Sequence, residues 1–317
     1  MAMLEDAPFD LLIPGRRPSG LAPVHLPFRG DEPDWDGFAH LLGRTVDAGL
    51  TPFVNAGPGA GDLASASLRA EVVATVGAAM GGRAFVAGVR AEDGDDGGFD
   101  PARLAGAVAS VARHGGLPAL LPSPTLAGLG LDEALGLVAW MGEWCDRLIA
   151  VDLPEGRWPG GRSWGLDAFT ALLEVAPCIG VVDGSWSRPA EWDRIRRRDE
   201  VRPDFRVFSA NVLAVDQIRF GADHALDLAA AVPDALADRD DAWEREDPEA
   251  LERDDALQAL ATLVFRAPYA AHRHSLALVL LLRGWLDHDG IAPGLARRPD
   301  GEIELLLPAL DRLGVLG

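Results

Sequence analysis

The sequence predicts an α/β fold, a (β/α)8 TIM barrel with a C-terminal helical extension. Short apolar segments alternate with amphipathic helical stretches eight times along the chain. No glycine-rich nucleotide-binding fingerprint follows the first apolar segment, which argues against a doubly wound sheet. We therefore expect eight parallel strands closed into a barrel, with the helices outside.

The eight predicted strands are short and largely apolar, as strands buried on both faces should be. They are Leu21–Phe28, Pro52–Asn55, Ala84–Val89, Leu117–Leu121, Leu148–Val151, Cys178–Val182, Arg206–Ser209 and His224–Leu226. The helical stretches between them repeat apolar residues at positions i, i+3 and i+4. They lie near Trp35–Ala48, Ser67–Met80, Pro101–His114, Asp132–Trp144, Leu166–Val175, Pro189–Arg197 and Val212–Phe220.

Two parts of the chain are expected. Residues 1–232 should form the barrel, and residues 233–317 an acidic linker and C-terminal helices that pack on it. The acidic stretch from Asp238 to Asp255 is predicted to be a solvated helix or linker. Three further helices are expected at Leu257–Phe265, Leu276–Leu286 and Ile303–Leu313.

Composition excludes several classes of partner. The net charge of −20 leaves no basic face for nucleic acid. The N-terminal segment is acidic before a short apolar stretch, unlike a secretory signal, and no apolar run is long enough to span a bilayer. Cys145 and Cys178 show no metal-ligand spacing, and we expect buried free thiols in a reducing cytoplasm.

The chain contains no lysine, and all 29 of its Lys+Arg residues are arginine. Schiff-base catalysis requires a primary amine whose pKa is low enough for it to attack a carbonyl. A guanidinium group cannot serve in its place. Chemistry that depends on a lysine Schiff base is therefore excluded.

Four motifs occur in an order and spacing that point to a known family. They are PVHLPF (Pro23–Phe28), AGPGAGDLASASLRAE (Ala56–Glu71), VDLPEGR (Val151–Arg157) and CIGVVDGS (Cys178–Ser185). Together with the closing helices, they resemble the dihydrodipicolinate synthase / N-acetylneuraminate lyase family over nearly the whole chain. The resemblance implies the barrel fold, a small 2-oxo acid-like carboxylate as ligand, and a homo-oligomer. The leucine-, alanine- and valine-rich last helices also favour an oligomer.

The same resemblance shows that the family's catalytic groups are missing. The position of its lysine falls on Val182, and that of its proton-relaying tyrosine falls on Val151. Its two substrate-gripping threonines fall on Gly59 and Ala60. Arg157 matches, with one inserted residue, the arginine that holds a substrate carboxylate. A surface salt bridge is the equally weighted alternative for Arg157.

The loop that begins at Gly57 and runs to Asp62 feeds a predicted helix, so its backbone N–H groups form a candidate anion site. A plain glycine turn with a helix cap is the alternative. The substrate-binding candidates are Arg157, Gly59, Ala60, Gly61, Asn55, Ser209 and Asn211.

Three further residues at predicted strand ends are candidates for catalysis: His25, Asp152 and Asp183. Asp152 and Asp183 follow neighbouring strands and could act as an acid/base pair or share a cation. Strand side chains alternate, however, so if Val151 and Val182 face the lumen the two aspartates turn away from it. We therefore favour structural roles for both, and no cofactor or metal site is predicted.

Two other motifs are discounted. The histidines of His272-Arg273-His274 lie two apart and point in different directions on a helix. The acidic loop from Glu92 to Asp100 lacks the alternation of a calcium-binding loop and is predicted to be a solvated turn. The only tyrosine, Tyr269, is expected in the C-terminal helices, away from the strand ends.

Two hypotheses for function remain open. The first is a lyase-like enzyme that acts on a small carboxylate without a Schiff base. The second is a non-catalytic barrel that binds a small carboxylate or a protein partner. Polar residues converging in the lumen beside Arg157 would favour the enzyme, and a plug of valine, leucine and tryptophan would favour the binder. In both cases the protein is expected in the cytoplasm.

Overall fold

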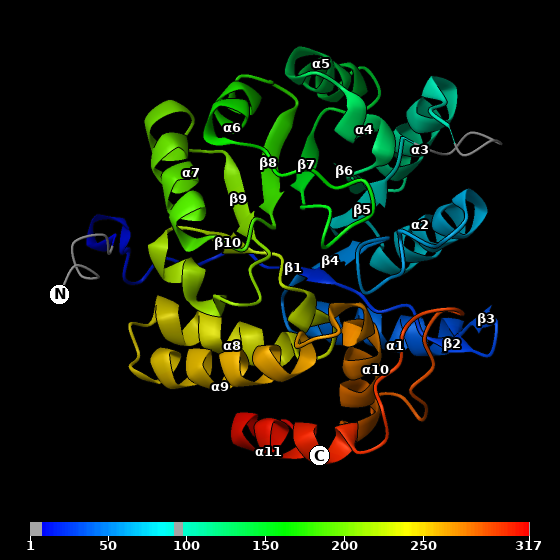
Figure 1. Cartoon of the computed structure of the whole chain (residues 1–317), viewed down its shortest axis with the longest axis vertical. Helices are drawn as coiled ribbons and strands as arrows, with labels where there is room; N and C mark the ends of the chain where they lie inside the picture. Colours follow the sequence, from blue (N-terminus) through cyan, green and yellow to red (C-terminus); the bar gives the residue numbers. More distant parts are fainter. Residues whose placement is uncertain (1–7, 92–97, 317) are drawn as a thin grey trace.

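Eight parallel strands form the central sheet of the computed structural model, which describes residues 8–91 and 98–316. In sheet order they are β1 (Leu21–Pro23), β4 (Thr51–Val54), β5 (Phe85–Val89), β6 (Gly116–Leu120), β7 (Leu148–Asp152), β8 (Cys178–Asp183), β9 (Arg206–Ser209) and β10 (Asp223–His224). A parallel bridge between Gly20 and His224 brings the last strand back to the first. The prediction of a (β/α)8 barrel is confirmed (Figure 1).

Helices alternate with the strands and surround the barrel (Figure 1). They are α1 (Trp35–Asp47), α2 (Ala66–Met80), α3 (Pro101–Arg113), α4 (Pro124–Gly128), α5 (Leu131–Met141), α6 (Leu166–Leu173), α7 (Arg188–Val201) and α8 (Pro233–Glu244). Side-chain caps begin several of them. Ser65, for example, accepts a hydrogen bond from the backbone N–H of Leu68 at the start of α2.

Two predicted elements differ from the observed ones. The first strand ends at Pro23, and Phe28–Arg29 instead forms a strand, β2, of a small antiparallel ribbon with β3 (Glu32–Pro33). The helix predicted at Val212–Phe220 is a 3-10 helix, η3 (Val215–Phe220). Gln258 of α9 hydrogen-bonds to the backbone of Val212 and Val215 and so holds the start of this segment by tertiary contacts.

The last part of the chain forms α9 (Glu249–Val264), the 3-10 helix η5 (Tyr269–Ala271), α10 (His272–Leu282) and α11 (Glu302–Leu313). Figure 1 shows α8 beside α9 and α11 beyond α9, and the first turn of α10 lies toward the barrel. The division at residue 232 and the homo-oligomer stay predictions.

The acidic stretch from Asp238 to Asp255 is helical over most of its length, in α8 and α9. It is also less solvated than expected. Arg239 is fully buried and pairs with Asp240 and Asp254 at 2.7 and 2.6 Å. The buried pair between Arg239 and Asp254 joins α8 to α9. A count of acidic residues cannot detect such a pair.

The core has two layers separated by the sheet. An outer layer lies between the strands and the helices, and a smaller inner cluster fills the lumen. Cys145 and Cys178 are buried free thiols, as predicted. Among the described residues, no helix has the length and apolar character needed to cross a bilayer.

Candidate functional site

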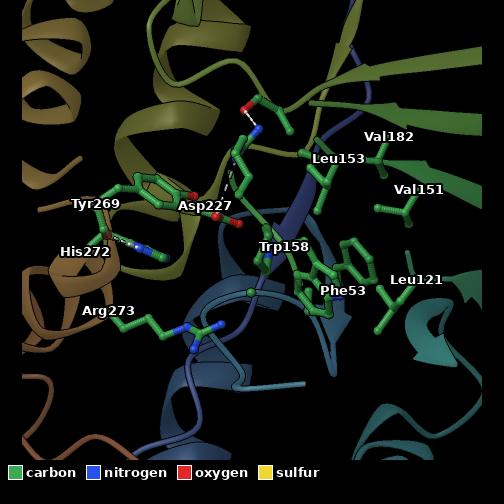
Figure 2. Close-up of a pocket in the computed structure, with 16 residues that line it drawn as sticks. Phe53, Leu121, Val151, Leu153, Trp158, Val182, Asp227, Tyr269, His272 and Arg273 are labelled. Atoms are coloured by element: carbon green, nitrogen blue, oxygen red, sulfur yellow. Dashed lines mark hydrogen bonds and ion pairs between the residues drawn. The ribbon is translucent and has the colours of Figure 1, made fainter. Parts of the chain in front are cut away.

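A small cavity lies at the carboxyl ends of the strands, where barrel enzymes keep their sites. Its volume is about 40 Å³. A cavity needs at least roughly 10–15 Å³ on this scale to hold one water molecule, so this one admits water, and a small carboxylate bound there would extend toward its partly open mouth. Its floor is apolar, and its rim carries charged and aromatic side chains (Figure 2).

The floor occupies the positions that the resemblance assigns to catalysis. Val151 and Val182 are register partners on β7 and β8, and both belong to the lumen cluster. Phe53, Leu121 and Trp158 pack around them (Figure 2). The floor thus has the valine, leucine and tryptophan expected of a non-catalytic barrel, while the rim beside Arg157 has the polar side chains expected of an enzyme, so the lumen meets both criteria.

Arg157 lies on the rim with its side chain only 5% exposed. Its Nη1 atom donates to the backbone carbonyls of Ala210 and Gly184, at 3.1 and 3.3 Å. Gly184 leaves room for this arrangement, because a Cβ atom at that position would lie 2.7 Å from Nη1 and 2.2 Å from Leu153 Cδ2 and would displace both side chains. The opposite nitrogen, Nη2, lies 4.0 Å from the Asp227 carboxylate. Arg157 is therefore a buried, oriented cation and not a surface salt bridge.

Two aromatic rings hold the Arg157 guanidinium from the side. Its central carbon lies 4.4 Å from the Trp186 ring centroid and 6.0 Å from that of Tyr269. The two rings meet edge to face at 5.3 Å. Burial raises the pKa of Tyr269, so its hydroxyl stays neutral. The expectation that Tyr269 lies away from the strand ends is wrong, because η5 brings its ring to the barrel mouth.

A second arginine, Arg273 of α10, lines the same cavity with its side chain 8% exposed. It is paired with Asp62 at 2.6 Å, across 211 positions of sequence. Arg90 donates to the backbone carbonyl of Asp62 at 2.7 Å and holds that residue from the other side. The carboxylate of Asp62 thus orients a cation at the cavity.

The loop that contains the predicted anion site is folded on itself. The N–H groups of Ala60 and Gly61 donate to the carbonyls of Gly57 and Ala56, both at 3.1 Å. A Cβ atom at Gly61 would lie 1.9 Å from the carbonyl oxygen of Asn55, so only glycine fits there. Within the described part of the chain, Gly57 lines the cavity and Gly59, Ala60 and Gly61 do not.

Asn55 takes a left-handed backbone conformation, with φ of 56°, at the start of this loop. Its side-chain amide donates to the carbonyl of Arg69 at 3.1 Å, toward α2 and away from the lumen. Asn55 therefore shapes the turn.

His25 is also buried beside this loop, and it does not line the cavity in the described structure. Its Nδ1 atom lies 3.2 Å from the carbonyl oxygen of Pro58. Burial lowers the pKa of His25 to about 4, so the ring is neutral at pH 7. This geometry gives His25 a supporting position behind the loop.

Asp152 and Asp183 turn away from the lumen, as strand alternation predicts. Both pair with Arg194 of α7, at 2.6 and 2.8 Å. Asp152 also accepts from the N–H of Trp164 at 3.1 Å, and Arg194 donates to the carbonyl of the same residue. Burial raises the pKa of Asp152 to about 6 despite the opposing Arg194 charge.

Ser209 and Asn211 belong to the same outward-facing region. Each donates to the carboxylate of Glu191 on α7, at 2.6 Å. Burial, with the Asp183 carboxylate nearby, raises the pKa of Glu191 to about 7. We call Asp152, Asp183, Glu191, Arg194, Ser209 and Asn211 the outer network. None of these residues lines the cavity in the described structure.

Four residues of the rim were missed from the sequence: Asp227, Tyr269, His272 and Arg273. Asp227 begins the 3-10 helix η4 (Asp227–Ala230) just after the last strand. The other three come from η5 and α10. The signal was the His272-Arg273-His274 motif, discounted as a metal site although it opens a helix that is otherwise apolar.

No group of three or more His, Cys, Asp or Glu side chains in residues 8–91 and 98–316 has an arrangement suited to a metal ion. Most of the acidic loop from Glu92 to Asp100 lies outside the described residues.

Comparisons with known proteins agree with the geometry at the level of fold. A prophage protein of the dihydrodipicolinic acid synthase family from E. coli K12, in complex with pyruvate, superposes with a TM-score of 0.82 and 14% identity, covering 94% of this chain and 99% of the other. The chloride-inhibited dihydrodipicolinate synthase of Acinetobacter baumannii, complexed with pyruvate, gives 0.77 and 18%, with coverages of 95% and 99%. A monomeric dihydrodipicolinate synthase variant gives 0.80 and 14%, with coverages of 94% and 97%.

The fold is that of the dihydrodipicolinate synthase barrels. No family model matches the sequence, and no curated protein matches it either. At such low identity the likeness concerns the backbone alone. The activity of this chain must therefore be argued from its own cavity.

Proposed function

We propose that this protein binds a small carboxylate at the barrel mouth and performs no lysine Schiff-base chemistry. The observation that carries the proposal is that two buried guanidinium groups, Arg157 and Arg273, line one small cavity above an apolar floor. Guanidinium groups match carboxylates in charge and geometry, and burial strengthens the pairing. Two of the solved barrels that share this fold are in complex with pyruvate, which supports the choice of ligand.

The mechanism of binding follows from which donors are already used. Nη1 of Arg157 is held by two backbone carbonyls, so the group is fixed while its other nitrogens stay available. Arg273 donates to Asp62 through Nη2 and so keeps a fixed orientation toward the cavity. Trp186 and Tyr269 pack beside the Arg157 guanidinium and limit its movement. A carboxylate would thus meet preoriented cations.

Isothermal titration calorimetry with propionate and pyruvate tests this proposal. Arg273→Gln and Arg157→Gln should each weaken binding by roughly 10- to 100-fold, because a charge-assisted hydrogen bond contributes about 1.5–3 kcal/mol. Arg297→Gln is the matched control, since Arg297 also pairs with a carboxylate, Asp289, but is half exposed and lies off the cavity. Equal affinities in wild type, Arg157→Gln and Arg273→Gln would refute the proposal.

A lyase-like enzyme is the second candidate, and Asp227 is the residue that favours it. Burial raises the pKa of this carboxyl, which lines the cavity and is a candidate general base. Such an enzyme would exchange the C3 protons of pyruvate with deuterium, and Asp227→Asn would abolish the exchange. NMR measures this exchange. A rate no faster than in protein-free buffer would eliminate this candidate.

A further inference from the structure

Four buried nitrogen atoms around the cavity have no hydrogen-bond partner among the described residues. They are Nε of Arg157, Nε1 of Trp158, Nε2 of His272 and Nε of Arg273. Each unpaired buried polar group costs about 1–3 kcal/mol, so native structures rarely keep several together. Other buried side-chain atoms among the described residues also lack partners, but these four belong to residues that line one cavity, which fits a ligand with more than one polar group.

The hydrogen-bonding role of His272 can be assigned from its surroundings. Its Nδ1 atom lies 2.8 Å from the carbonyl oxygen of Tyr269, which can only accept, so Nδ1 carries the hydrogen. Burial and the neighbouring Arg273 lower the pKa of His272 to about 3, so the ring is neutral. Its unpaired Nε2 is therefore an acceptor, and Figure 2 shows the ring directed from α10 toward the cavity.

Asp227 supplies a second acceptor. Its side chain is 14% exposed, and its ion pair with Arg157 is long, at 4.0 Å. No hydrogen bond from the described residues ends on its carboxylate oxygens. Gly57 brings the loop close, since a Cβ atom there would lie 3.3 Å from Oδ2 of Asp227. The cavity thus has acceptors from η4 and α10 and donors from Arg157, Trp158 and Arg273.

The charges at the rim are balanced. Arg273 is paired with Asp62, and Arg157 faces Asp227. A simple carboxylate would add a negative charge beside the Asp227 carboxylate. A ligand that carries an ammonium group next to its carboxylate would avoid this repulsion and give both acceptors a donor.

We propose that the ligand is a small apolar α-amino acid of about the size of alanine, bound as its zwitterion. Its carboxylate meets Arg157 and Arg273, its ammonium group meets Asp227 and His272, and its side chain rests on the apolar floor. This assignment rests on the proposed function, because it uses the same carboxylate grip. The small volume of the cavity, about 40 Å³, favours the smallest side chains.

Calorimetric titration with L-alanine, lactate, pyruvate and propionate at pH 8 tests the assignment, since the four differ only in the group on C2. Alanine should bind at least tenfold more tightly than propionate. Asp227→Asn should reverse the order, weakening alanine at least tenfold while propionate binds as well or better. Asp216→Asn is the matched control, because Asp216 pairs with Arg188 and lies off the cavity.

A second variant guards against a folding defect in the first. His272→Phe keeps a ring to stack on Tyr269 and removes the Nε2 acceptor. It should weaken alanine several-fold and leave propionate unchanged. The assignment would be overturned if Asp227→Asn did not reverse the order of the alanine and propionate affinities and His272→Phe weakened both ligands equally.

The two proposals fail differently in this experiment. If propionate, lactate or pyruvate binds through Arg273 but alanine does not, the amino acid assignment is wrong and carboxylate binding stands. If none of the four binds, both are wrong.

Discussion

Three neighbouring strands place unlike side chains at consecutive positions. At the ends of β7, β8 and β9, Val151, Val182 and Phe208 face the lumen, whereas Asp152, Asp183 and Ser209 face α7. Val151 and Val182 form part of the apolar floor beneath unpaired polar atoms, and Phe208 packs with them in the lumen cluster. The outward residues form the outer network, in which the charges pair with one another.

The difference shows that polarity at a strand end does not by itself indicate a site. Side-chain alternation sends one residue to the lumen and the next to the helix layer. In this chain the polar residues went to the helix layer, where they hold α7 and the segment before α6. The polar groups at the cavity come from loops and from α10 instead.

A lysine introduced on the apolar floor tests whether these surroundings activate an amine. Wild type should form no borohydride-trapped adduct with pyruvate on any side chain, because it has no lysine. Val182→Lys should form one, since apolar surroundings lower the pKa of a lysine and leave it unprotonated. Peptide mapping by mass spectrometry measures the effect, which is all or none.

An exposed lysine provides the control for that experiment. Arg196→Lys introduces a single lysine at a solvated position of α7, where the amine keeps its charge at pH 7.5. Equal trapping in both variants would show that the floor does not activate the amine.

Removal of Arg194, the central cation of the outer network, tests how much the paired charges stabilise the fold. Arg194→Met leaves Asp152 and Asp183 buried without their partner and should lower the free energy of unfolding by about 3–5 kcal/mol. Arg196→Met, on the same helix but at an exposed pair, should change it by less than about 1 kcal/mol. Urea unfolding followed by tryptophan fluorescence measures both, and similar losses would contradict the distinction.

A smaller effect in the outer network is expected from the titration of Glu191. The pKa of Glu191 is raised to about 7 in the folded state, so its contribution to stability is complete below its ordinary pKa of 4.5 and is lost as pH rises through 7. Glu191→Gln lacks this loss. The free energy of unfolding of the variant, relative to that of wild type, should therefore rise by about 1–3 kcal/mol between pH 4.5 and pH 8.

Urea unfolding at several pH values measures that gain. The difference between variant and wild type cancels the opposite contribution of the buried histidines, His25 and His272, whose pKa values are lowered. Glu200→Gln, at an exposed position of α7, should give a difference that does not vary with pH. A flat difference for Glu191→Gln as well would show that Glu191 does not titrate in this range.

Local patterns were enough to predict most of the fold. Eight apolar segments and the intervening periodicity gave every strand of the barrel, because short-range burial patterns determine these elements. The outward direction of Asp152 and Asp183 also followed from alternation. The 3-10 form of η3 did not, because contacts with Gln258 of α9 hold its start.

The cavity was predicted only at Arg157 and its neighbouring loops. Asp227, His272 and Arg273 reach it through tertiary packing, and the pair between Asp62 and Arg273 joins positions 211 residues apart. Residue spacing carries no information about such a contact. The sequence did show a charged residue, Arg273, at the start of the apolar helix α10. Its meaning becomes clear only once that helix is placed on the barrel.

The ion pair between Asp62 and Arg273 has a consequence for synthesis. The last strand of the barrel, β10, leaves the ribosome before α10 does, so the sheet can close while the cavity still lacks Arg273, His272 and Tyr269. A nascent chain that stops short of α10 would therefore lack three of the residues that line the cavity. The proposed ligand site is complete only when the C-terminal helices have been made and have docked.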